Sequence, residues 1–157
     1  MGNLFTARGV DGDLQLSNGS TAVLFDVLVL AGSQAARTPW EQHLVLLFAD
    51  SERMGYGIGG FDAADLPWTD AADSEIAFFR RIVAVARTGH GWDRLGYEPA
   101  FVADQLTTYA RMLDSFEPVP DGASAMGDWS APPPPEQHEL CSRHGVLQGS
   151  YGCRLCG

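Results

Sequence analysis

The chain has 157 residues, of which 45% are hydrophobic and 19% are charged, and its formal net charge is −10. This length and composition are typical of one globular domain with a short appendage, and they exclude a fibrous or a fully disordered protein. The negative charge disfavours nucleic acid as a partner, because it would repel the phosphate backbone, whereas a basic protein would be attracted.

No membrane segment is expected. The longest apolar run, residues 22–32, is interrupted by Asp26 and is far shorter than the roughly 20 residues that a membrane-spanning helix needs. The first residues also lack the basic, apolar and small-residue series of a signal peptide. We therefore expect a cytoplasmic protein in a reducing compartment, where thiolates can be kept for a metal ion.

The first part of the chain predicts a β-hairpin. Residues 13–16 lead through Asn18 and Gly19 into an apolar run over residues 21–30, and Asn-Gly between apolar segments is typical of a two-residue hairpin turn. Along the second segment, β-branched and aromatic side chains would share one face, as a strand packed on a core requires. These side chains belong to Val23, Phe25, Val27 and Val29.

A helix is the alternative for residues 20–31, with Ser20 or Thr21 as its N-cap, because a continuous apolar run does not reveal its own period. We prefer the strand. A second apolar run, residues 43–48, is expected to form a further strand with residues 56–61 as its hairpin partner. Together these segments predict a small, mainly antiparallel sheet.

Two helices are predicted after the sheet. The first covers about residues 72–87, with Asp70 or Ser74 as its cap and Gly89 at its end. The second begins near Pro99, a favoured residue of the first helical turn, and its apolar side chains recur at helical spacing. The buried face of this second helix is expected to consist of Val102, Leu106, Tyr109, Leu113 and Phe116.

The composition changes after residue 116. Residues 117–137 hold six of the nine prolines, and the four consecutive prolines at 132–135 favour an extended polyproline II spacer. Trp129 lies within this segment, and we expect its side chain to anchor the linker to the core rather than to bind a ligand.

The last residues of the chain have the spacing of metal ligands. Cys141 and His144 form a C-x2-H pair, and Cys153 and Cys156 form a C-x2-C pair, so all three cysteines lie here. Two such pairs on short turns can complete a tetrahedral site, and four protein ligands leave no open position, which predicts structural Zn2+. His138 is the alternative fourth ligand, although it lies outside the C-x2-H spacing.

This tail resembles the zinc knuckles and short zinc ribbons of many bacterial proteins, which have many different functions. The predicted fold class is α+β, a small, mainly antiparallel sheet with two C-terminal helices, followed by a proline-rich linker and a zinc knuckle. We accordingly divide the chain into a globular domain, residues 1–116, a proline-rich linker, residues 117–137, and the zinc knuckle, residues 138–157.

No catalytic centre is predicted. Residues 55–60 match G-x-G-x-x-G, but no long helix follows them and no basic residue accompanies them, so nucleotide binding is disfavoured. Asp62 and Asp65 are interpreted as turn and cap residues. Nothing in the sequence brings His43 or His90 to a carboxylate as a general base would require.

The remaining aromatic residues suggest how the chain functions. Trp68, Trp92 and Tyr97 are expected to pack the helices onto the sheet, or, if exposed, to form a binding patch. Residues 59–68 and 91–99, each followed by a helix, resemble small acidic bacterial proteins of the toxin-immunity type, which implies binding to a protein.

We therefore expect a non-enzymatic, zinc-binding protein-interaction module, either an immunity protein or an adaptor, with a protein partner that is basic. The alternatives are a nucleic-acid-associated regulatory protein that uses the zinc knuckle, and a small enzyme whose catalytic residues form no recognisable motif.

Overall fold

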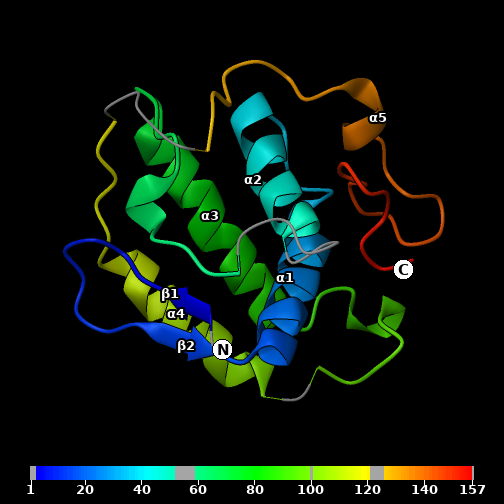
Figure 1. The fold of residues 1–157 in the computed structure, drawn as a ribbon, viewed down its shortest axis with the longest axis horizontal. Coiled ribbons are helices and arrows are strands. Elements are labelled where there is room, and N and C mark those ends of the chain that lie inside the picture. Colours follow the sequence, from blue (N-terminus) through cyan, green and yellow to red (C-terminus); the bar gives the residue numbers. More distant parts are fainter. Residues whose placement is uncertain (1–2, 52–58, 100, 121–125, 157) are drawn as a thin grey trace.

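A computed structural model describes residues 3–51, 59–99, 101–120 and 126–156, and four long helices form its body (Figure 1). The strands are β1 (Asn3–Phe5) and β2 (Leu14–Leu16), which pair antiparallel, with Leu4 opposite Gln15. The helices are α1 (Asn18–Gly32), α2 (Pro39–Asp50), α3 (Ala72–Arg87), α4 (Val102–Asp114) and the short α5 (Pro135–His138), with single 3-10 turns at Ala63–Asp65 and Trp92–Arg94. The fold is thus a mixture of helix and sheet.

The strand predicted over residues 21–30 is wrong, because these residues lie in α1. Asn18 and Gly19 occupy the first turn of this helix instead of a hairpin, and the Ser17 hydroxyl caps it by accepting a hydrogen bond from the Ser20 N–H. α1 is in contact with α2, α3 and α4, and so apolar side chains are buried on several of its sides. A helix that is buried on several sides has no amphipathic period by which to recognise it.

The strand predicted over residues 43–48 is also wrong, because these residues lie in α2. Thr38 and Glu41 form a capping box, and Pro39 occupies the first turn, where a missing N–H has no cost. Half of the expected partner strand, residues 56–58, lies outside the described residues, and residues 59–61 form no strand. The sheet therefore consists of β1 and β2 in the part of the chain that the structure describes.

α3 begins and ends at the predicted residues, and the five apolar positions predicted for the second helix are all buried in or beside α4. The cap of α3 differs from the prediction. Neither Asp70 nor Ser74 caps it; instead the Glu75 carboxylate accepts hydrogen bonds from the N–H and the hydroxyl of Thr69. Gly89 follows the helix with φ +83°, a value that favours glycine.

Trp129 anchors the segment after α4 to the body, as predicted. Its ring is 5% exposed, packs edge-on to Trp40 at a centroid distance of 5.3 Å, and stacks on His43 at 5.9 Å. Trp68 is also buried, and its indole N–H donates to the Ala63 carbonyl. Trp68 therefore belongs to the core and not to a surface patch.

None of the helices in the described part of the chain is long and apolar enough to cross a membrane.

Candidate metal centre

The tail that carries the predicted ligands lies beside α1 and α2, on the side away from α4 (red in Figure 1). Its first turn is closed by two hydrogen bonds, from the Gly145 N–H to the Cys141 carbonyl and from the Cys141 N–H to the Val146 carbonyl. Gly145 has φ +69°, which glycine adopts without steric cost. In the second turn the Cys156 N–H donates to the Cys153 carbonyl.

These two turns bring the four predicted ligands together. The ligand atoms of Cys141, His144, Cys153 and Cys156 all lie within 4.8 Å of one another. The Nδ1 atom of His144 is 3.9, 3.5 and 3.4 Å from the three sulfurs in chain order, and the Cys141 and Cys156 sulfurs are 3.7 Å apart. His138 is not in this cluster.

These distances match a tetrahedral metal site. Zinc–sulfur bonds of about 2.3 Å and zinc–nitrogen bonds of about 2.0–2.1 Å imply ligand separations of about 3.8 Å between sulfurs and about 3.6 Å between sulfur and nitrogen. The three sulfur–nitrogen separations and the Cys141–Cys156 separation lie within a few tenths of an ångström of these values, and the Cys153 sulfur lies within 4.8 Å of the other two sulfurs. The cluster is therefore compact enough to hold a metal ion.

The thiols differ in their local electrostatics. Burial opposes ionisation of the Cys141 thiol, but hydrogen bonds from His144 and from the Arg143 N–H outweigh it and lower its pKa to about 6. Burial raises the pKa of the Cys153 thiol to about 12, although the N–H groups of Leu155 and Cys156 donate to its sulfur. The Cys141 and Cys153 sulfurs thus each accept from the N–H groups two and three residues further along. These hydrogen bonds favour the thiolate form that binds metals, and at Cys153 burial outweighs them.

Arg154 links the ligand turn to the helical body. It stands between Cys153 and Cys156, and its Nε donates to the Asp26 carboxylate of α1 at 2.5 Å. Both side chains are largely buried, with 6% and 16% exposed. Its guanidinium also donates to the carbonyls of Phe48 and Ser51, where it complements the negative end of the α2 dipole.

Tyr97 is a second hydrogen-bond donor to Asp26. The Tyr97 hydroxyl donates to the other carboxylate oxygen at 2.5 Å. Burial, followed by this hydrogen bond, raises the pKa of Tyr97 well above its usual value, so the hydroxyl keeps its proton and continues to donate. One carboxylate of α1 is thus shared between the metal-site turn and the loop after α3.

Further contacts place the rest of the tail against the same surface. The Leu147 N–H donates to the Ser33 hydroxyl at 3.0 Å, and the Ser150 N–H donates to the Asp50 carboxylate at 2.9 Å. Gly149 fits closely here, because a Cβ atom on it would collide with that carboxylate. The Val146 and Leu147 side chains belong to the same hydrophobic cluster as those of α1 and α2. The tail therefore lies across the core.

Asp62 and His43, which were also considered for chemistry, have structural partners. Asp62 caps the Ala63–Asp65 turn, as predicted, and its partial burial is outweighed by hydrogen bonds from the Ala64 N–H, the Thr6 hydroxyl and the Arg8 N–H, which hold its pKa below the usual value. His43 lies 2.8 Å from the Ala131 carbonyl, on the stacked Trp129. Neither arrangement brings an imidazole to a carboxylate as an acid–base pair.

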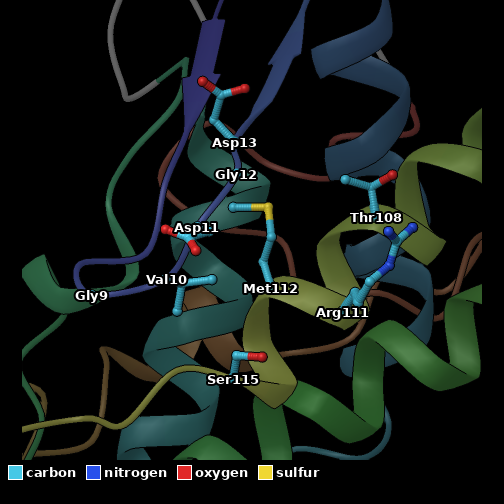
Figure 2. A pocket seen from close by; sticks show the side chains of 9 residues that line it. All are labelled: Gly9, Val10, Asp11, Gly12, Asp13, Thr108, Arg111, Met112 and Ser115. Atoms are coloured by element: carbon cyan, nitrogen blue, oxygen red, sulfur yellow. The ribbon is translucent and has the colours of Figure 1, made fainter.

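A surface depression of about 370 Å3 lies between residues 9–13 and the last turns of α4 (Figure 2). Its polar groups include the carboxylates of Asp11 and Asp13 and the guanidinium of Arg111, and Figure 2 shows the Met112 thioether between them. The lining contains no cysteine or histidine. This depression therefore has no part in the metal centre.

The sequence predicted the four residues that the structure brings together, but it did not predict the contact between Asp26 and Arg154 that joins their turn to the body. The sequence contains one signal for this contact, because Asp26 is a charged residue within an apolar run. A charge that is buried requires a partner. Comparison of the chain with protein-family models, with curated proteins and with solved structures finds no match.

Proposed function

We propose that Cys141, His144, Cys153 and Cys156 bind one structural Zn2+. The observation that supports this most strongly is the set of ligand separations, which fits a tetrahedral ion. Thiolate and imidazole ligands in a tetrahedral arrangement favour zinc over magnesium or calcium, which require oxygen ligands. Four protein ligands fill the coordination sphere, so the ion has no open position for a substrate, and we propose that the protein is not an enzyme.

The ion would have a definite structural task. The tail contains no helix or strand between Cys141 and Cys156, so its contacts with the body must offset the chain entropy that is lost when it is ordered. A bound ion would join the two turns of the tail by coordination bonds and keep Arg154 directed at Asp26. Zinc would thereby fasten the tail over α1 and α2.

We further propose that the protein acts by binding a protein partner, as an immunity protein or an adaptor does. Phe101 supports this proposal, because its side chain is 81% exposed and its backbone has φ +66°, which is unusual for a bulky residue. Strained residues that are exposed occur preferentially at functional sites, and an exposed aromatic ring is a typical anchor of an interface. The net charge of −10 would attract a basic partner.

The alternative that the tail binds nucleic acid has little support in the structure. Of the two arginines in the tail, Arg154 is buried against Asp26, which leaves Arg143 exposed. One exposed arginine on an acidic protein supplies little attraction for a phosphate backbone.

Affinity capture with the zinc-loaded full chain tests the partner proposal. We expect recovery of a basic protein whose binding weakens with added salt and falls at least about tenfold in the Phe101→Ala variant, as for a central anchor residue. Val119→Ala is the matched control, since Val119 is also exposed, at 69%, but has no unusual backbone. Recovery of nucleic acid alone, or equal effects of both substitutions, would contradict the proposal.

A further inference from the structure

We propose that Cys156 is an oxidant-sensitive ligand, and that a peroxide converts Cys156 and Cys141 to a disulfide with release of the zinc ion. This inference rests on the proposed zinc site and adds a form of regulation to it. Its basis is the unequal exposure of the ligands and the close approach of two sulfurs from the two turns.

The exposure of the ligands determines where an oxidant can react. Cys141, His144 and Cys153 are buried, whereas Cys156 is exposed to solvent. Oxidation of cysteine follows thiolate character and accessibility, and coordination to zinc keeps the sulfur as a thiolate. Cys156 is therefore the cysteine of the cluster that is most accessible to a peroxide in solution.

The second sulfur is already in position. The Cys141 sulfur lies 3.7 Å from the Cys156 sulfur, although the two residues are 15 positions apart in sequence. A disulfide bond of about 2.0 Å needs a further approach of less than 2 Å by side chains on two short turns. Cys141 is thus placed to react with an oxidised Cys156 without unfolding of the body.

The reaction balances with a peroxide as the oxidant. The Cys156 thiolate attacks one peroxide oxygen, the O–O bond breaks, and the departing hydroxide takes a proton and becomes water. The Cys141 thiolate then attacks the resulting sulfenic sulfur, the S–O bond breaks, and a second hydroxide leaves and is protonated to water. The two sulfurs lose two electrons in total, which the peroxide gains, and zinc stays Zn2+.

Loss of two ligands would leave the ion with Cys153 and His144 alone, which do not form a structural zinc site. The ion that holds the two turns would then leave, and the turn that carries Arg154 would keep only its contacts with the body. A thiol reductant should reverse the disulfide and allow zinc to bind again. The tail would therefore respond to the redox state of its surroundings.

The experiment follows zinc release from the zinc-loaded full chain during treatment with hydrogen peroxide, with a chromogenic zinc chelator as the probe. Two matched variants each replace a thiolate with another zinc ligand, Cys156→His at the exposed position and Cys153→His at the buried one. We expect zinc release to be at least about tenfold slower in Cys156→His than in the wild type, while Cys153→His remains sensitive. Peptide mapping of the oxidised wild type should show a Cys141–Cys156 disulfide.

Equal peroxide sensitivity of the two variants would overturn the proposal, as would a wild-type disulfide that excludes Cys156 or zinc that is retained under peroxide. If neither variant binds zinc, the peptide map of the wild type still tests the proposal, because it shows which cysteines form the disulfide. A purified wild-type chain that never binds zinc would contradict the proposed function itself, which separates the two failures.

Discussion

Replacing His144 with alanine is expected to lower the affinity for zinc by more than about 100-fold. The reason is that replacing even a residue that only supports a ligand lowers metal affinity by about 10–100-fold. The Nδ1 atom of His144 lies within 3.9 Å of all three sulfurs, where it can supply the fourth ligand of the proposed zinc site. Its removal leaves an open position that water would fill, which changes a closed structural site into a weaker one. Competition with a chelator of known zinc affinity measures the loss.

His138→Ala is the matched control for this prediction. The two histidines are six positions apart, but His138 ends α5 and lies outside the ligand cluster. Its replacement should leave the zinc affinity within about twofold of the wild type, because it removes no ligand. The reverse result, with loss of zinc in His138→Ala and not in His144→Ala, would show that the other histidine is the ligand.

The same pair of variants tests the structural task of the ion. The N–H groups of Leu147 and Ser150 are bonded to Ser33 and Asp50 of the body, and hydrogen exchange at these amides reports whether the tail is docked. We expect protection of both amides to fall in His144→Ala, while amides of α3, which carries no ligand, retain theirs. Unchanged protection in the tail would mean that its contacts hold it without the ion.

The Asp26→Asn substitution is expected to destabilise the protein by about 3–5 kcal/mol, the usual cost of removing one partner from a buried ion pair. The carboxylate accepts hydrogen bonds from Arg154 and Tyr97, and the Arg154 side chain is only 6% exposed. An asparagine of similar size would leave that guanidinium buried without a counter-charge. Since a domain is stable by only about 5–15 kcal/mol, the change should be large in urea unfolding.

Two controls identify the cause of this loss. Arg8→Ala removes a partner from the Arg8–Asp65 pair, whose side chains are 73% and 54% exposed, and it should change stability by less than about 1 kcal/mol. Adding Arg154→Met to Asp26→Asn removes the unpaired charge, so the double variant should recover part of the lost stability. A double variant that is less stable than Asp26→Asn by the full cost of Arg154→Met would exclude coupling between the two residues.

Local signals in the sequence predicted some elements and failed for others. α3 and α4 are amphipathic, and therefore the spacing of their apolar residues was sufficient to find them. α1 is buried on several sides and rich in β-branched residues, so it resembled a strand. α2 could have been recognised from Thr38, Pro39 and Glu41, whose capping box is visible in the sequence.

The candidate site could also be predicted only in part. The grouping of the four Cys and His residues was predictable because each pair is close in sequence and its spacing follows from the geometry of a turn. The contact between Asp26 and Arg154 joins residues 128 positions apart, and no local pattern contains that information. The division into a globular domain, a linker and a knuckle stays a prediction, and it must accommodate a tail that shares the hydrophobic cluster of the helices.

The central claim is that three sulfurs and one imidazole nitrogen hold one zinc ion. X-ray absorption at the zinc edge of the purified full chain tests it most directly. We predict three sulfur neighbours at about 2.3 Å and one nitrogen at about 2.0–2.1 Å, with the nitrogen lost in His144→Ala. A purified chain without zinc, or a zinc shell made mainly of oxygen and nitrogen, would contradict the account.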